Sequence, residues 1–497
     1  MKKFTKLTAL FLALLMSFSL VTVSFAAEVD TCPVIYLPGL STSDLYHDVN
    51  DPSTEVTFPS VEEVKKMVTD KIVPALIVYA ADKDADKLAS VISDQFNIIF
   101  AGYFHNPDGS PKGNSGAIVD YPSSIAENAR VTFDWDWRSD PFVAAEKLND
   151  FVDYVIAKSG CDKVALASHS LGSVVILTYL NIYGDDKISG IVYDTPVVDG
   201  VNYLGEFLLG NFETDGEALM AVVRSLFSAS EDRELAESIM DVFTLAGIPE
   251  ELSILLNSIL DKITPVIFRD TLVPLFACWP SVWAMVPEAD FDAAVDFIFS
   301  NYLTDGDATV LRAKVEKYND EIRADRYEVL ADFDKEGRFA IISRYGNTSL
   351  PLMDRWADTG DTVVETKSSS LGATTAPYGE IFDDSYLTAK DADYISPDKT
   401  IDASTCLFPE KTWFIKGVSH GQTHVSIPLY SSLLFGIDEA TCDNYSLARF
   451  TAYDAESDSI VEDTSEPEEN KAKSPFEVLF NFLRALLKKI LSFFKIG

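Results

Sequence analysis

The chain has 497 residues, of which 47% are apolar and 24% charged, and its formal net charge is -38. This composition excludes disorder over most of the length, and the length allows two to four domains or one large domain with an insertion. Nucleic acid is excluded as a partner, because phosphate would be repelled by so acidic a protein. Five cysteines are too few for a disulfide scaffold; Cys406 and Cys442 are a conceivable pair.

The N-terminus resembles an export signal. Lys2, Lys3 and Lys6 precede an uncharged, mostly apolar run over residues 7–23, and small residues flank Phe25 at a cleavage position. We therefore expect a secretory signal peptide over residues 1–26, with a membrane anchor as the alternative. Its removal brings the net charge from -38 to about -41, because three lysines leave. The mature protein is expected to be secreted and extracellular, or associated with the cell envelope.

Strand and helix patterns alternate along the first part of the chain. The predicted elements are a strand over 31–40, helices within 59–100, a strand over 129–135, a helix over 141–159, a strand over 164–167 and a helix from 171 onward. This alternation predicts an α/β fold with a mostly parallel sheet and helices on its faces.

The pattern changes after residue 200. Residues 201–335 contain one helical pattern after another, and strand-like runs return at 339–343 and 412–416. The simplest interpretation is a core formed by residues 27–200 and 336–450, interrupted by a helical cap or lid over residues 201–335.

The clearest chemical motif is Ser-His-Ser-Leu-Gly at residues 168–172, between a predicted strand and a predicted helix. It matches the G-x-S-x-G nucleophile elbow, with Ser168 in place of the first glycine. In such an elbow a sharp turn exposes the central serine, here Ser170, and the N-terminus of the helix points N–H groups at developing negative charge. An ordinary serine turn is the alternative.

A serine nucleophile needs a base and an acid that orients the base. His420 and His424 follow the strand-like run 412–416, and we favour His424, with His420 as the alternative. The chain order Ser, Asp, His places the acid between these positions, where Asp361 is favoured over Asp358. His169 is expected to point away from the site, and no role is assigned to His47 or His105.

Two backbone N–H groups should stabilise an oxyanion. One is expected from Leu171, the residue after the nucleophile, and the other from a loop after an early strand. Leu40, which follows the Pro38-Gly39 turn, is the candidate for the second donor; an ordinary strand-ending turn is the alternative.

The C-terminus changes character twice. Eight acidic and no basic residues lie between 454 and 469, which favours a solvated linker over residues 451–474. Residues 475–497 then show a basic amphipathic helix pattern, with polar residues on one stripe. Such a helix on a tether favours membrane-surface contact, whereas docking on its own domain or self-association is the alternative.

Several motifs, in this order, resemble the lecithin:cholesterol acyltransferase-like branch of the α/β-hydrolases. They are PVIYLPGL at 33–40, FDWDWR at 133–138, SHSLGS at 168–173, CWPSVWAMVP at 278–287, GDTVV at 360–364 and HGQTH at 420–424. The resemblance covers roughly residues 31–435. It implies the catalytic triad Ser170, Asp361 and His424, an acyl-ester substrate and no metal or cofactor.

The sequence departs from the family pattern at two places. Ser168 replaces the usual glycine of the elbow. The acid turn is one residue shorter than in the family, which leaves open whether Asp358 or Asp361 is the triad acid. In the cap, Trp279, Trp283 and Met285 either line an acyl-chain site or form cap core.

The resulting hypothesis is a secreted serine acyl-ester hydrolase of the lipase or phospholipase type, or a related acyltransferase. The alternatives are an esterase or amidase acting on soluble or cell-wall substrates, and a non-enzymatic surface-binding protein on a hydrolase scaffold. The expected partner is a lipid or another acyl ester, with membrane contact through the C-terminal helix.

Overall fold

The structure is a computed structural model of the whole chain. It describes residues 32–57, 59–227, 233–334, 339–349, 353–435 and 440–467, together with residues 475, 478–479 and 481–483 of the C-terminal segment. The expected signal peptide, residues 1–26, lies outside the described residues.

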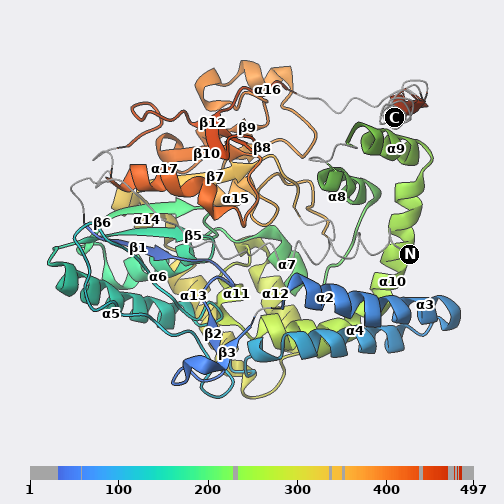
Figure 1. Cartoon of the computed structure of the whole chain (residues 1–497), viewed down its shortest axis with the longest axis horizontal. Helices are drawn as coiled ribbons and strands as arrows, with labels where there is room; N and C mark the ends of the chain where they lie inside the picture. The colour runs from blue at the N-terminus through green and yellow to red at the C-terminus, as the bar shows by residue number, and fades with distance from the viewer. Residues whose placement is uncertain are drawn as a thin grey trace, which may run out of the picture.

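The centre of the molecule is one eight-stranded sheet (Figure 1). Its neighbouring strands are parallel except for the last pair at one edge, which is antiparallel. In spatial order the strands are β12 (Ser459–Glu462), β11 (Phe450–Asp454), β10 (Thr412–Lys416), β7 (Phe339–Tyr345), β6 (Ile188–Asp194), β5 (Val164–His169), β1 (Val34–Leu37) and β4 (Arg130–Thr132). The predicted α/β class, with a mostly parallel sheet consistent with an α/β-hydrolase, is confirmed.

Both faces of the sheet are covered by helices. α5 (Pro141–Ser159) and α6 (Gly172–Tyr183) pack on one face, where they join the largest apolar cluster, and α17 (Thr423–Phe435) packs on the other. Because side chains alternate along a strand, Val164 and Leu166 of β5 belong to the first cluster and Ala165 and Ala167 to the second. This burial on both faces explains why the strands are continuous apolar runs.

The expected cap is helical where the structure describes it. The chain between β6 and β7 forms α7 (Asn202–Leu208), α8 (Gly216–Phe227), α9 (Arg233–Leu245), α10 (Ile248–Ile267), the π-helix Phe268–Ala277, α11 (Pro280–Trp283), α12 (Glu288–Asn301), α13 (Ala308–Tyr318), the π-helix Asn319–Arg323 and α14 (Arg326–Asp334).

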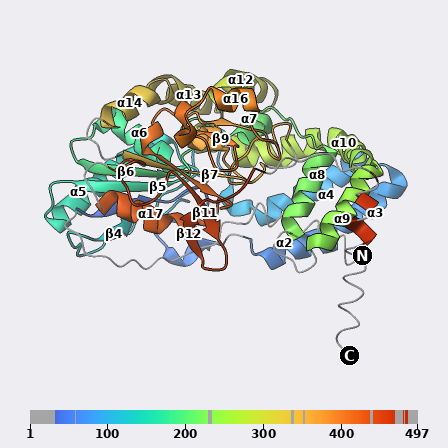
Figure 2. The same ribbon diagram turned by 90° about the horizontal axis from the view of Figure 1, so that it is seen from above.

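A second helical segment, which lies within the expected core 27–200, packs against this cap. α2 (Val61–Met67), the π-helix Val68–Ile72, α3 (Val73–Asp82) and α4 (Ala85–Ile99) follow β1. α4 packs along α10, and Leu88 and Tyr79 share a buried cluster with Ile263. We call α2–α4 together with α8–α10 the helical arm; it extends from one end of the sheet (Figures 1 and 2).

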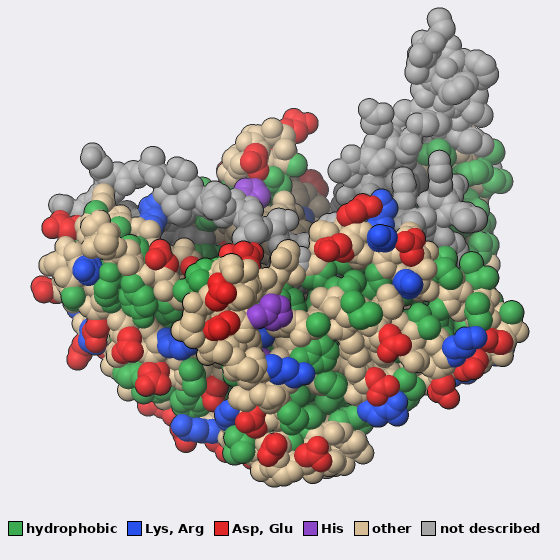
Figure 3. Space-filling model, turned by 60° about the horizontal axis from the view of Figure 1, so that its bottom comes forward, with side chains coloured by type: hydrophobic (Ala, Val, Ile, Leu, Met, Phe, Trp, Pro, Cys, Tyr) green, Lys and Arg blue, Asp and Glu red, His purple; other side chains and the backbone are tan. Residues whose placement is uncertain are grey.

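The arm exposes large aliphatic side chains. Ile77, Ile98, Ile254 and Leu255 are each more than half exposed. In Figure 3 hydrophobic side chains gather at the right-hand end of the molecule, where the arm lies.

The acidic segment after residue 450 differs from the expected linker over 451–474. Its first part forms β11 and β12, which extend the sheet beyond β10. Asp463 is buried and accepts a hydrogen bond of 2.6 Å from the Tyr345 hydroxyl, and Lys416 Nζ donates to Ser465 at 2.8 Å. The acidic composition predicts a solvated linker here. Strand pairing and these two polar contacts instead hold the segment against the sheet.

The C-terminal helix is described only in part. Pro475, Val478, Leu479 and residues 481–483 are helical, and the other residues of the expected helix 475–497 lie outside the described part. Among the described residues, no helix combines the length and apolar character that crossing a membrane requires.

All five cysteines are free thiols, so the conceivable Cys406–Cys442 pair is not formed. The remaining short elements are β2 (Leu45–Tyr46), β3 (Glu55–Val56), β8 (Thr374–Thr375), β9 (Ile401–Asp402), α15 (Thr366–Ser369), α16 (Asp384–Thr388) and the 3-10 turns Pro52–Thr54, Ala101–Tyr103, Ala392–Tyr394, Ala403–Thr405 and Pro409–Lys411.

Candidate active site

The Ser170 turn has the geometry of a nucleophile elbow. β5 ends at His169, Ser170 adopts a left-handed backbone conformation with φ of 52°, and α6 begins at Gly172. A Cβ atom at Gly172 would lie 2.4 Å from the main-chain oxygen of Leu37, so a side chain there would collide with β1. Serine rarely adopts a positive φ, and such strain is found mainly where the surrounding fold enforces it.

Other strained residues gather at the same edge of the sheet. Ser41 follows β1, Thr195 follows β6 and Thr362 lies in the loop after β7, with φ of 61°, 46° and 83°. Because the carboxyl ends of parallel strands lie at one edge, these turns surround the edge that carries Ser170. Binding and catalytic groups of open α/β sheets are concentrated at this edge.

Both predicted oxyanion donors lie in segments next to Ser170. Leu171 follows it directly and is fully buried. A Cβ atom at Gly39 would lie 2.9 Å from the Ser170 Cβ, so the turn that contains Leu40 approaches the nucleophile closely. Neither the Leu40 nor the Leu171 N–H donates to another backbone group of the described residues. Their role as oxyanion donors stays a prediction.

Asp361 contacts a histidine directly. His420 Nδ1 lies 2.7 Å from Asp361 Oδ2, and the His420 backbone N–H donates to the Asp361 carbonyl at 2.8 Å. The second carboxylate oxygen accepts the N–H groups of Val363 and Val364 at 3.0 and 2.8 Å. Both side chains are buried, so the ring and the carboxylate are held in one relative orientation.

The environment keeps Asp361 ionised. Burial by itself raises the pKa of this carboxyl, but His420, Arg344 and the Val364 N–H together outweigh burial and leave the pKa below its usual value of 3.8. Asp358, the alternative acid, instead accepts a hydrogen bond of 2.7 Å from the Asn202 side chain, and burial raises its pKa. Asp358 therefore connects the acid loop to α7 of the cap, whereas Asp361 contacts the histidine.

The preference for His424 over His420 is wrong as far as contact with Asp361 is concerned. His424 lies in the first turn of α17, is partly exposed, and has its Nε2 3.4 Å from Asp458 Oδ1. The physical reason is local geometry: His420 belongs to the loop that returns along Asp361, whereas the helix that starts at Thr423 turns His424 away.

His169 does not point away from the site as expected: it belongs to a buried polar cluster beside His420 that sequence reasoning missed. The His169 and His420 rings lie 4.5 Å apart, and His169 Nδ1 lies 3.3 Å from Asp194 Oδ2. Burial, followed by the nearness of His420, lowers the pKa of His169 to about 4, so its ring is neutral at neutral pH. Asp194 also binds Arg344. An arginine inside the apolar strand 339–345 is the signal that could have revealed this cluster, because arginine is rarely buried without a partner.

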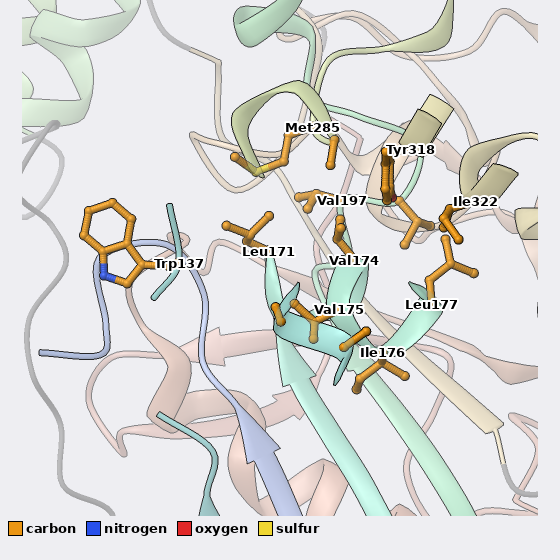
Figure 4. Packing of buried hydrophobic residues seen from close by; sticks show 14 of the residues in the cluster. Trp137, Leu171, Val174, Val175, Ile176, Leu177, Val197, Met285, Tyr318 and Ile322 are labelled. Carbon is orange, nitrogen blue, oxygen red and sulfur yellow. The ribbon is translucent and has the colours of Figure 1, made fainter. Parts of the chain in front are cut away.

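The three cap residues proposed for acyl-chain contact are buried. Trp279 Nε1 donates to the Tyr103 carbonyl at 2.9 Å, and Trp283 Nε1 donates to the Ala277 carbonyl at 2.8 Å, so both indoles are fixed in the core. Met285 lies above Leu171 and Val197 (Figure 4). Of the three, Met285 is the one that Figure 4 places over the elbow, and substrate contact stays a prediction.

No metal site accompanies this cluster: across the described residues, His, Cys, Asp and Glu side chains do not gather in groups of three that could hold an ion.

No model of a known protein family matches the chain, and no curated protein matches it. Among solved structures, a chain of the crystal structure of the Tle4-Tli4 complex is similar, with 12% sequence identity, a TM-score of 0.26, and coverage of 64% of this chain and 75% of that chain. The assignment of the fold rests on the strand order and on the Ser170 elbow.

Proposed function

We propose that this protein is a serine acyl-ester hydrolase of the lipase or phospholipase type that uses Ser170, His420 and Asp361. The contact between His420 and Asp361, formed beside the strained Ser170 turn, is the observation that carries the proposal. Along the chain the order is nucleophile, orienting acid and base, which is typical of the α/β-hydrolases.

The reaction follows from these roles. Asp361 accepts a hydrogen bond from the Nδ1–H of His420, which leaves the unprotonated Nε2 to take the proton of the Ser170 hydroxyl as the serine attacks the ester carbonyl. The N–H groups of Leu171 and Leu40 stabilise the oxyanion. His420 then protonates the departing alcohol, and water, or an alcohol in an acyltransferase, takes the acyl group from Ser170.

A lipid substrate is supported by the helical arm. Its Ile77, Ile98, Ile254 and Leu255 are exposed large aliphatic side chains. Apolar surface of this kind gains about 25 cal/mol per Å² when it is removed from water. A soluble substrate would require no such surface.

The ends of the chain fit the same proposal. The signal-peptide pattern supports secretion, and the basic amphipathic pattern of residues 475–497 supports contact with a lipid surface. In the described part of that helix, Val478 is 4% exposed, whereas Leu479 and Leu483 are each 54% exposed. Since Leu479 and Leu483 are four residues apart, they share one helix face, which is available to a lipid.

The test is a substrate panel on the mature protein: p-nitrophenyl esters of short and long acyl chains, a phospholipid, a triglyceride and an amide. We expect ester hydrolysis that increases with chain length and a loss on the order of 10³- to 10⁶-fold in Ser170→Ala. Cleavage of the amide alone would favour an amidase. Full activity of Ser170→Ala would remove the nucleophile assignment.

A further inference from the structure

We propose that the buried pair formed by Asp194 and Arg344 is a positioning device that holds the His420 loop against the Ser170 elbow. The inference rests on the proposed function, because it concerns the alignment of the proposed base with the proposed nucleophile. Neither residue touches the reacting atoms, so both are positioning residues.

Arg344 holds the backbone of the His420 loop. This fully buried residue of β7 donates from Nη1 to the carbonyls of Ser419 and His420, at 2.7 and 2.9 Å. From Nη2 it donates to the Ser426 hydroxyl at 3.0 Å, so it also reaches α17. One guanidinium therefore fixes the loop on both sides of the base.

Asp194 holds the elbow. It is the last residue of β6 and is fully buried, and its main-chain carbonyl accepts the Ser170 N–H at 3.0 Å. Its carboxylate lies 3.3 Å from the His169 ring, on the residue that precedes the nucleophile. The positive φ of Ser170 is thus stabilised from β6 by a backbone hydrogen bond.

Asp194 and Arg344 bind each other and so connect the Ser170 elbow to the His420 loop. Arg344 Nη2 donates to both carboxylate oxygens of Asp194, at 3.1 and 2.8 Å. Burial raises the pKa of Asp194, but Arg344 and then His169 outweigh it, so the net shift is downward and the carboxylate is ionised. The connection runs from the Ser170 backbone through Asp194 and Arg344 to the His420 backbone, whereas Asp361 controls the His420 ring.

A planar guanidinium is required for this arrangement. Its donors point in fixed directions, which lets one group bind a carboxylate and two carbonyls at once. The ammonium of lysine keeps the charge but presents its donors from a single atom, so it cannot serve all these partners together. Loss of these contacts would let His420 shift, and a displacement of about 1 Å can cost on the order of 100-fold in rate.

The test compares Arg344→Lys with Arg326→Lys. Arg326 is a matched control: it is also mostly buried, binds Asp199 at 2.7 Å and Glu288 at 2.9 Å, and lies in the cap at α14. For each variant we would measure kcat and KM on a short p-nitrophenyl ester, the rate at which a fluorophosphonate modifies Ser170, and the thermal unfolding midpoint.

We expect Arg344→Lys to lower kcat on the order of 10- to 100-fold, with KM within about threefold, and to slow phosphonylation by a similar factor. Arg326→Lys should keep both rates within about threefold. Equal rates in the two variants would overturn the inference. An effect on KM alone, with unchanged phosphonylation, would also overturn it.

A double variant covers the case in which Arg344→Lys does not fold. Asp194→Leu with Arg344→Met replaces the pair by apolar side chains, which often preserves stability where the loss of one partner does not. A folded double variant with wild-type kcat would overturn the inference, and a low kcat would support it. Ser170→Ala and His420→Gln in the same assay separate the two proposals: if either retains full activity, the proposed function itself fails.

Discussion

His420 Nδ1 lies 2.7 Å from Asp361 Oδ2, and this contact joins the two loops that follow β10 and β7. The same two residues are joined a second time through the backbone, where the His420 N–H donates to the Asp361 carbonyl at 2.8 Å. The backbone bond fixes the loop beside Asp361, and the Nδ1 contact fixes the orientation of the ring. Nε2 is the ring nitrogen that does not contact Asp361, and in the proposed mechanism it exchanges a proton with Ser170.

The first prediction concerns the two histidines. His420→Gln should lower kcat/KM for a short p-nitrophenyl ester by on the order of 10³-fold or more, because the proposed base is removed. His424→Gln should stay within about threefold, since His424 lies on the outer side of α17 near Asp458. The comparison requires that both variants fold, so each should have the same thermal unfolding midpoint as the wild type. The reverse order of activities would return the role of base to His424.

The second prediction concerns the two acids. Asp361→Asn should lower kcat by on the order of 10⁴-fold, because the amide no longer holds the productive tautomer of His420. Asp358→Asn should cost far less activity, since Asp358 binds the Asn202 side chain of the cap. The measurement is kcat for the same soluble ester in both variants. A larger loss in Asp358→Asn would contradict the assignment.

The third prediction concerns Glu365, which is buried in the acid loop. Its Oε2 accepts the Asn202 N–H at 3.1 Å, and its Oε1 has no hydrogen-bond partner among the described residues. Burial raises the pKa of Glu365 to about 8. The folded protein therefore keeps a proton that the unfolded chain loses near pH 4.5, so the stability from Glu365 is full below that pH and is lost as pH rises toward 8.

Denaturant unfolding between pH 5 and 8 checks this. The wild type should lose up to about 1.4 kcal/mol per pH unit through this group. Glu365→Gln keeps the shape of the side chain without the titration, so its stability should fall less steeply with pH. Parallel curves for the two proteins would show that Glu365 does not hold a proton in the folded state.

The fourth prediction concerns the C-terminal helix. Truncation after Pro467 keeps β11, β12 and the buried Asp463, so hydrolysis of a soluble ester should be unchanged. Binding to anionic vesicles should weaken, because each lost Lys or Arg near the surface is worth about 1 kcal/mol. Co-sedimentation of both proteins at low and high salt is the measurement. Equal binding would favour a helix that docks on its own protein.

Several features could be predicted from the sequence because they are local. The strand, the sharp turn and the helix around Ser170 depend on small residues at fixed spacing, and the segment 201–335 shows helical periodicity without help from distant contacts. The alternation of strands and helices in turn determined the α/β class. The turn around Asp361 also depends on local contacts, since the carboxylate accepts hydrogen bonds from the N–H groups of the two residues Val363 and Val364.

Tertiary structure decided which of two nearby candidates meets a distant partner. His420 and His424 are four residues apart, and only the path of the loop along Asp361 distinguishes them. Asp194 and Arg344 are 150 positions apart in the chain and become neighbours because β6 and β7 pair in the sheet. The acidic strands β11 and β12 form because β10 offers an unpaired edge. Local patterns carry propensity and spacing, whereas burial and pairing across the sheet depend on which strands become neighbours.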